Sequence, residues 1–464
     1  MMPRLALKRA LLLAVLSPAL ASVARAELLA MAPVHPGGAT SASSLYGLPP
    51  TERYTLHYQA TVIEQGDARF RAPHSGQNSL QPNPQEAVSV TSTLFIGMRL
   101  LPGTEIYLNP ELAGGRGLSG ALGLAGETNG ETYRVGDPAP TISTARLFVR
   151  QVFSFGSETE ALADGPNQIA GTVAARRLTV VAGKFSLVDY FDGNAYSHDP
   201  RSQFMNWTLM SPAAWDYPAD TRGYTWGAMA EWQDRDWAAR AAFVAEPKRA
   251  NQLDMDRRIG RANGSVVEGE HRLDIIDGRK GAARLLGYIN QADMGNYDQA
   301  ISGSAATGAS PNIVSTRKYG RTKYGASFNA DQELTGSLGV FARASWSDGR
   351  NESWAFTETD ASEALGVEWK PARWSRPDDR WGVAMVSNEL SRPHRRYLAN
   401  GGDGFLLGDG ALRYGPELVA ETYYRFPVRE HLFVSPDYQF VVNPGYNRDR
   451  GPVQVWALRV HAEF

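Results

Sequence analysis

Hydrophobic and polar side chains alternate with a period of two along the final segment of the chain, residues 453–464. One face of this segment is mostly apolar and carries Gln454, Trp456, Leu458, Val460, Ala462 and Phe464. The other face carries Val453, Val455, Ala457, Arg459, His461 and Glu463. Because successive side chains of a strand point to opposite faces, this pattern predicts a strand that lies between an apolar medium and water.

The same alternation recurs upstream and predicts sixteen strands. We expect them at residues 53–64, 86–101, 104–112, 141–155, 176–188, 222–233, 236–246, 266–276, 281–291, 318–330, 333–347, 354–370, 380–389, 414–426, 431–442 and 453–464. In hydrocarbon every backbone polar group needs a partner within the protein, so membrane-spanning strands must close into a barrel. The expected fold is therefore all-β, a transmembrane antiparallel up-and-down β-barrel of about 16 strands, of the outer-membrane porin type.

The lengths of the connections support this fold. Tight turns, such as those expected at residues 277–280 and at Asp331-Gln332, fall at one end of the barrel, and long loops fall at the other. One connection on the long-loop side, near Asp348-Gly349, is expected to be short. A soluble sandwich, the alternative for an all-β chain, would not sort its connections in this way. Bacterial outer-membrane barrels have this asymmetry, so we expect the outer membrane of a Gram-negative cell, with both termini on the periplasmic side.

The chain begins with the pattern of a secretory signal peptide, residues 1–26. Cations precede a short apolar run at residues 11–16, and an A-x-A cleavage site follows at residues 24–26. Residues 27–52 are rich in Pro, Gly, Ser and Ala and are expected to form a flexible periplasmic segment ahead of the barrel at residues 53–464.

Composition excludes several classes of function. The chain has no cysteine and a formal net charge of −2, which argues against thiolate metal sites, disulfides and a basic face for nucleic acid. Its eight histidines are scattered, and no nucleophile, phosphate-binding or zinc motif accompanies them. We therefore expect neither enzymatic activity nor a cofactor.

Strand parity assigns a set of charged side chains to the lumen, which is expected to hold water at this barrel size. These are Arg146, Arg150, Arg240, Arg284, Arg321, Lys323, Arg343, Glu421 and Arg425. Charge is costly against lipid and inexpensive in a wet lumen. Most of these side chains are expected to be hydrated or to pair across the wall.

The longest connection, at about residues 189–219, has an unusual composition for a solvent-exposed loop. It combines many aromatic rings with several carboxylates. Loops of this length are usually functional or disordered, and the aromatic content argues against disorder. We therefore expect this loop to fold into the lumen, with its rings packed against the wall.

Several segments of the sequence resemble those of a known protein family. The residues that carry the resemblance are Lys184-Phe185-Ser186, Asp189-Tyr190-Phe191-Asp192, Phe204-Met205-Asn206-Trp207, Trp215-Asp216-Tyr217-Pro218-Ala219-Asp220 with Arg222-Gly223-Tyr224, Asn129-Gly130-Glu131, and Arg146-Leu147-Phe148 with Arg150-Gln151. They are similar to the carbohydrate-selective porins of the OprB type, over nearly all of residues 50–464. The resemblance implies a sixteen-stranded barrel whose inward-folded loops narrow the pore and favour sugars.

The chemistry of the loop also suits a sugar. Hydroxyl groups both donate and accept hydrogen bonds, and the apolar face of a sugar ring stacks on aromatic rings. We hypothesise that Arg146, Arg150 and Lys184 on the wall face Asp189, Asp192, Asn194 and Asn206 of the loop. Trp207, Trp215 and Tyr217 are the expected stacking surface, and Asp216 and Glu131 complete the candidate constriction. The inward placement of Lys184 would require a β-bulge, because strict parity points it at lipid.

The expected function is passive, selective diffusion of monosaccharide-like carbohydrates through a pore narrowed by loops. The main alternative is a general or anion-selective pore, because arginines outnumber acids among the expected lumen charges. The expected partners are carbohydrate solutes, outer-membrane lipid and lipopolysaccharide, and both a monomer and a homotrimer stay open.

Overall fold

The computed structural model describes residues 52–131, 139–276, 278–305 and 308–464. Within these ranges sixteen antiparallel strands close into one barrel, which confirms the expected fold. The strands are β1 (Tyr54–Asp67), β2 (Glu86–Leu101), β3 (Thr104–Gly115), β4 (Thr141–Leu162), β5 (Gly171–Phe185), β6 (Thr225–Asp234), β7 (Trp237–Ala245), β8 (Asn263–Leu273), β9 (Gly281–Met294), β10 (Lys318–Thr335), β11 (Leu338–Ser347), β12 (Ala361–Trp369), β13 (Arg380–Glu389), β14 (Glu417–Arg429), β15 (Leu432–Val442) and β16 (Val453–Glu463). The expected signal peptide and nearly all of the expected periplasmic segment lie outside the described residues.

The barrel closes between its first and last strands. β1 pairs antiparallel with β16 from Gln59 opposite Glu463 to Asp67 opposite Val455. The terminal residue adds to this seam, because the Phe464 amide donates to the Tyr58 carbonyl at 2.8 Å and the Tyr58 amide donates to the Phe464 carbonyl at 3.1 Å. Neither terminal strand therefore keeps an unpaired edge along this seam.

The two faces of the wall follow the alternation seen in the sequence. In β16, Trp456 is 46% exposed on the outside, whereas Arg459 is fully buried inside the barrel. Other large apolar side chains on the outside are Leu285, Phe328, Leu365 and Met385. The outer surface is therefore an apolar belt, and most of the charged residues of the strands face the lumen.

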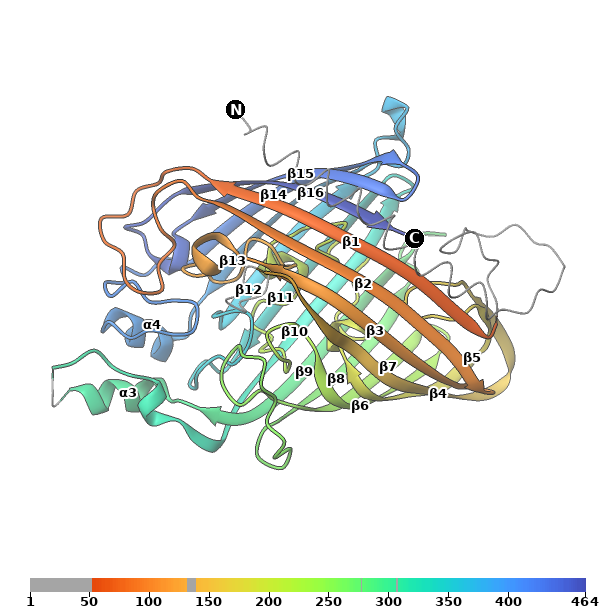
Figure 1. Ribbon diagram of the computed structural model, residues 1–464, viewed down its shortest axis with the longest axis horizontal. Coiled ribbons are helices and arrows are strands. Elements are labelled where there is room, and N and C mark those ends of the chain that lie inside the picture. The colour runs from red at the N-terminus through yellow and green to blue at the C-terminus, as the bar shows by residue number, and fades with distance from the viewer. Residues whose placement is uncertain (1–51, 132–138, 277, 306–307) are drawn as a thin grey trace.

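The two ends of the barrel differ. At the turn end, where β1 begins and β16 ends, connections such as residues 102–103, 235–236, 336–337 and 430–431 are tight. At the loop end the connections include residues 68–85, 186–224, 246–262 and 390–416. The helices α3 (Tyr297–Ser304) and α4 (Arg392–Ala399) also lie at the loop end, on the left of Figure 1.

The remaining helical segments are single turns. They are α2 (Trp207–Met210), η3 (Leu118–Gly120), η4 (Leu187–Asp189), η5 (Val314–Thr316), η6 (Ala372–Trp374) and η7 (Pro444–Tyr446). Among the residues that the structure describes, no helix has the length and apolarity needed to cross a membrane.

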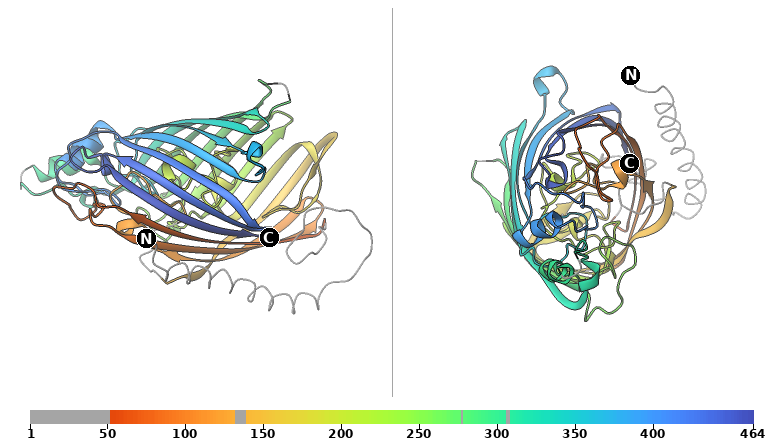
Figure 2. Two further views of the ribbon diagram at one scale, coloured as in Figure 1. Left: turned by 90° about the horizontal axis from the view of Figure 1, so that it is seen from above. Right: turned by 90° about the vertical axis from the view of Figure 1, so that its left-hand side faces the viewer.

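Two loops from the loop end occupy the interior, as the view along the barrel shows (Figure 2, right). We call residues 186–224 the lumen loop and residues 348–360 the second lumen loop. Buried rings of the lumen loop pack against wall residues in two clusters, one around Phe191 and Tyr217 and one around Phe204. The hydrophobic core of this protein therefore lies inside the barrel, between loop and wall.

Several expected strand bounds are wrong, and the start of the twelfth strand is one of them. The twelfth strand begins at Ala361 and not at residue 354, because residues 354–360 belong to the second lumen loop. Trp354 and Phe356 are residue types that are common in strands, but here they are buried in the loop, at 0% and 5% exposed. The connection at Asp348-Gly349 is therefore not a short one.

The turn expected at Asp331-Gln332 is also misplaced. β10 continues to Thr335, and the turn is at residues 336–337. Asp331 stays in the strand because it faces the lumen, where its carboxylate accepts from Arg284 at 2.6 Å. An acidic residue thus has a stabilising partner inside the barrel that a local pattern does not reveal.

The apolar belt yields a testable prediction. Leu365 lies at the middle of β12 and is 59% exposed on the outer face. Leu365→Arg should lower the free energy of unfolding in lipid vesicles by about 2–4 kcal/mol, because an arginine would then face hydrocarbon. Denaturant titration of the vesicle-embedded protein measures this change.

Glu363→Arg is the matched control for this substitution. Glu363 occupies the same outer row of β12, two residues nearer the loop end, and already carries a charge. Its replacement should leave the free energy of unfolding nearly unchanged. Equal effects of the two substitutions would show that Leu365 does not face hydrocarbon.

Candidate functional site

The candidate site begins on the inner wall of β4. Arg146 faces the lumen there, and a register shift between Asn109 and Pro110 of β3 marks a bulge beside it. Its guanidinium binds the Asp189 carboxylate with two hydrogen bonds, from Nε and from Nη2, both at 2.6 Å. The ring of Tyr224 lies under the guanidinium, 5.1 Å from Cζ. Arg146 and Asp189 therefore join wall and lumen loop, as hypothesised.

The Asp189 side chain keeps 25% of its surface exposed, whereas Arg146 keeps 10%. Asp189 ends the short helix η4, which follows directly from β5. A paired guanidinium and carboxylate that still reach open space offer hydrogen-bond donors and acceptors side by side. Asp189 is therefore the most accessible residue of the hypothesised set.

Polar contacts continue from this pair across the wall. The Tyr224 hydroxyl donates to Glu111 at 2.9 Å, and Thr93 donates to the same carboxylate at 2.8 Å. Thr91 lies two residues before Thr93 on the same face of β2, and it donates a hydrogen bond to Glu131 at 2.5 Å. Glu131 in turn forms an ion pair with Arg201 of the lumen loop at 2.9 Å.

Two of the three hypothesised wall cations have other partners. Arg150 binds Glu105 at 2.6 Å and the Asn167 carbonyl at 3.1 Å, and both partners lie on the wall or in the turn after β4. Lys184 donates to the Thr144 carbonyl at 3.0 Å, and its ammonium lies 3.7 Å from Asp220. Among the residues that the structure describes, neither Arg150 nor Lys184 contacts any of the four loop residues Asp189, Asp192, Asn194 and Asn206.

The β-bulge expected at Lys184 is not found. Lys184 pairs in unbroken register with Leu147 of β4 and Trp226 of β6, two residues that are exposed on the outer face. Lys184 therefore belongs to the outward row. It reaches Asp220 because it lies near the loop end of β5, where its flexible stem extends toward the loops.

Asp192 forms a second anchor of the lumen loop. Its carboxylate lies 2.9 Å from Arg343 and accepts from Asn329 at 2.6 Å, and its amide donates to Glu268 at 2.7 Å. The side chains of Asp192 and Arg343 are each 2% exposed. Asn194 adds a bond to Asn329 at 2.7 Å. We call Asp192, Asn194 and their wall partners the latch.

Asn206 holds the loop to a second part of the wall, on β14 and β15. Its side chain caps α2 by accepting from the Thr208 amide, and its Nδ2 donates to Gln439 of β15 at 2.9 Å. Glu421 of β14 accepts from the backbone amides of Met205 and Asn206 at 2.5 and 3.0 Å. The lumen loop is therefore attached to the wall at two distant places.

The hypothesised aromatic residues are mostly covered. Trp215 and Tyr217 are 3% and 2% exposed, so neither presents a free ring face. Trp207 is partly exposed and stacks on Phe356 with centroids 4.5 Å apart and an interplanar angle of 10°. Of the three rings, only Trp207 keeps surface for a solute.

Asp216 connects the two lumen loops. Its carboxylate accepts from the backbone amides of Trp354 and Ala355 at 2.8 and 2.9 Å. Burial raises the pKa of this carboxyl above its usual value, and the nearby Lys323 ammonium opposes the rise. Burial likewise raises the pKa of Glu131, against the charge of Arg201.

Sequence reasoning missed several residues of this arrangement. Arg201 lies in a loop without periodicity, Phe356 lies in a segment whose alternation predicted a strand, and Glu105 and Glu268 are single acids on inward rows. Parity could have assigned both acids to the lumen. It could not have paired Glu105 with Arg150 or Glu268 with Asp192, because periodicity determines neither the register between two strands nor the contacts of a loop.

Two cavities lie toward opposite ends of the barrel, and the lumen loop lines both. An outer cavity of about 620 Å³ at the loop end includes Thr221 of the lumen loop in its lining. An inner cavity of about 510 Å³ is lined by residues of the turn end and by Tyr196 and Gln203 of the lumen loop. Tyr196 lies directly on β11, where a Cβ at Gly339 would overlap its ring.

Comparison with known proteins agrees with this architecture. The family model described as "Carbohydrate-selective porin, OprB family" matches residues 77–464. The curated proteins contain no match. Among solved structures, a high-pH structure of Pseudomonas putida OprB is similar, with a TM-score of 0.67 and 16% identity over 89% of this chain and 94% of that one.

Two further solved structures are less alike. A low-pH structure of Pseudomonas putida OprB has a TM-score of 0.49 and 13% identity over 89% of this chain and 93% of that one. The outer-membrane channel DcaP of Acinetobacter baumannii has a TM-score of 0.48 and 8% identity over 89% and 97%. The family match covers most of the chain, and its family and fold point to a channel and not to an enzyme. The chain belongs to the carbohydrate-selective porin OprB family.

Proposed function

We propose that this porin gives passive diffusion of neutral, monosaccharide-like carbohydrates across the outer membrane, through a lumen that the lumen loop narrows. The observation that carries the proposal is the Arg146–Asp189 pair, which is partly exposed and stands between the inner wall and a loop that lines both cavities. The loop end would face the cell exterior and the turn end the periplasm, as in other outer-membrane barrels.

The pair suits a solute with several hydroxyl groups. The Arg146 guanidinium donates, the Asp189 carboxylate accepts, and a sugar hydroxyl can do both, so a passing sugar can exchange its hydration shell for these groups. The partly exposed ring of Trp207 would stack on the apolar face of the sugar. Arg201 and Glu131 offer a second donor–acceptor pair on the other side of Glu111.

The alternative, an anion-selective pore, is less well supported by the contacts of the lumen arginines. Arg240 lies within 3.1 Å of three carboxylates, those of Glu231, Glu268 and Glu270. Arg284 binds Glu270 and Asp331 at 2.9 and 2.6 Å. These carboxylates neutralise Arg240 and Arg284. The net positive charge of the lumen is therefore smaller than the number of its arginines suggests.

The surroundings of the pore are also part of the proposal. The apolar outer belt would contact the hydrocarbon of the outer membrane, and lipopolysaccharide would surround the loop end. A monomer and a homotrimer are both compatible with this outer surface, and chemical cross-linking of the protein in membranes distinguishes them.

Liposome swelling tests the proposed function directly. Vesicles that contain the full-length mature protein should swell faster in glucose than in maltose or in an anionic sugar such as gluconate, because a narrowed, charge-balanced lumen favours small neutral solutes. Equal rates for all three solutes would indicate a general pore. Faster swelling in gluconate would indicate the anion-selective alternative.

The Arg146–Asp189 pair gives a second prediction. Asp189→Asn keeps the size of the side chain and removes its charge, so sugar-dependent block of the conductance in planar bilayers should weaken about fivefold to tenfold. Asp298→Asn is the control, since Asp298 lies in α3 and is 57% exposed there. Unchanged block in Asp189→Asn would remove this carboxylate from the solute path.

The latch gives a third prediction. Asp192→Ala leaves the buried Arg343 without its carboxylate, and a broken buried pair typically costs about 3–5 kcal/mol. The lumen loop should therefore detach from β10 and β11, while Asn206 still attaches the loop to β15. Single-channel conductance should rise and selectivity among sugars should fall.

Asp192→Asn serves as the comparison for the latch. It keeps the shape of the side chain and its ability to accept a hydrogen bond from Asn329, so its conductance should lie between those of the wild type and Asp192→Ala. Wild-type conductance in Asp192→Ala would show that the latch does not set the width of the pore.

A further inference from the structure

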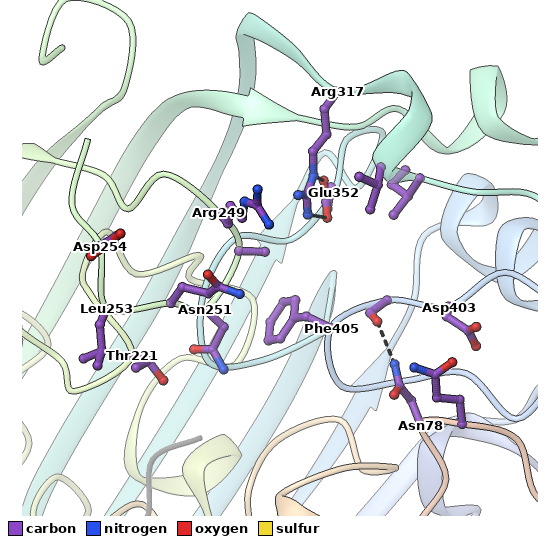
Figure 3. Close-up of a pocket in the computed structure, with 16 residues that line it drawn as sticks. Asn78, Thr221, Arg249, Asn251, Leu253, Asp254, Arg317, Glu352, Asp403 and Phe405 are labelled. Atoms are coloured by element: carbon purple, nitrogen blue, oxygen red, sulfur yellow. Dashed lines mark hydrogen bonds and ion pairs between the residues drawn. The ribbon is translucent and has the colours of Figure 1, made fainter. Parts of the chain in front are cut away.

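The outer cavity differs chemically from the lumen below it. It is formed by six connections of the loop end, and Figure 3 shows its lining side chains directed toward one another. Its volume of about 620 Å³ lies within the range of pockets that enclose a small organic ligand. The lining includes Arg249, Arg317, Glu352 and Phe405.

Several polar groups of this lining have no partner. Arg249 is exposed and makes no hydrogen bond or ion pair to any part of the chain that the structure describes. Thr221 Oγ1 and Asn251 Nδ2 are buried atoms without a hydrogen-bond partner in the same described ranges. By contrast, Arg146, Asp189, Asp192 and Arg343 in the lumen are all paired. Arg249 therefore brings an exposed guanidinium without a partner to the outer cavity.

A second guanidinium on this lining can donate to the hydroxyl groups of a ligand. Arg317 binds the buried Glu352 through Nε at 3.0 Å and Nη2 at 2.6 Å, and 17% of the Arg317 side chain stays exposed (Figure 3). The half-buried ring of Phe405 lies on another side and offers an apolar surface. A sugar ring has this same combination of hydroxyl edge and apolar face.

The charge of the lining selects among ligands. Two cations, Arg249 and Arg317, stand against three carboxylates, those of Asp254, Glu352 and Asp403. A strongly anionic ligand would meet this excess of acid, whereas a neutral ligand pays no such cost. The cavity is therefore better matched to a neutral polyhydroxylated ligand than to a phosphate or uronate.

We infer that the outer cavity is a docking site for a neutral saccharide of one or two rings, held by Arg249 and the Arg317 guanidinium against the Phe405 ring. The inference rests on the proposed function, since it supplies a place where solute gathers before it reaches the Arg146–Asp189 pair. Thr221 belongs to both the cavity lining and the lumen loop, so a docked saccharide lies at the entrance to the narrowed segment.

Ligand-observed saturation-transfer NMR on the detergent-solubilised full-length mature protein tests the site, with maltose as the probe. Arg249→Gln and Phe405→Ala should each weaken maltose binding about fivefold to tenfold, the effect of one lost charged hydrogen bond or one stacking contact. Arg257→Gln is the matched control, because Arg257 is exposed in the same connection but does not line the cavity. It should bind maltose like the wild type.

The possible outcomes separate this site from the proposed function. Weaker binding in Arg249→Gln and Phe405→Ala, with unchanged binding in Asp189→Asn and Arg257→Gln, supports the docking site. Binding that is lost only in Asp189→Asn, or that is absent in the wild type, overturns it. A different result would contradict the proposed function, namely that vesicles containing the wild-type protein do not swell in sugar. Since Arg249 is exposed, its replacement should not affect folding, which the heat-dependent mobility of the barrel in electrophoresis checks.

Discussion

The closure of the backbone hydrogen-bond ladder between β1 and β16 is the constraint on which the rest of this structure depends. An open sheet edge in hydrocarbon would leave a row of amide and carbonyl groups without partners, each at a cost of several kcal/mol. The terminal Phe464 extends this seam by two backbone bonds to Tyr58. Once the sheet is closed, its inner face must enclose either water or more of the chain.

In this protein the barrel interior contains both. The lumen loop fills much of it, and a loop folded into a wall of charged residues must satisfy their hydrogen bonds and its own. In the latch, Asp192, Arg343, Asn329 and Glu268 satisfy one another's hydrogen bonds. Where the loop meets β14 and β15, Asn206, Glu421 and Gln439 satisfy those of loop and wall. Buried ion pairs contribute little net stability, but removing one partner is costly, so they define the position of the loop.

This arrangement separates two kinds of polar group. Those in the lumen are mostly paired with each other and stay available to a solute only where they remain partly exposed, as Asp189 does. Those around the outer cavity include Arg249, which has no partner among the described residues. A solute would thus meet Arg249 before it reaches the Arg146–Asp189 pair. Weak binding at both places is compatible with rapid passage, because a diffusion pore must release what it binds.

The sequence by itself determined the wall of this protein. Period-two alternation predicted sixteen strands and the inward rows that carry Arg146 and Arg343, because the side-chain period of a strand is a local property. Only the tertiary structure decided which groups meet. Arg150 pairs with Glu105 and Lys184 with Asp220, the tryptophan at position 215 is buried, and residues 354–360 leave the strand pattern to fill the lumen. Such contacts join segments far apart along the chain, and their energies depend on burial and distance, which alternation does not encode.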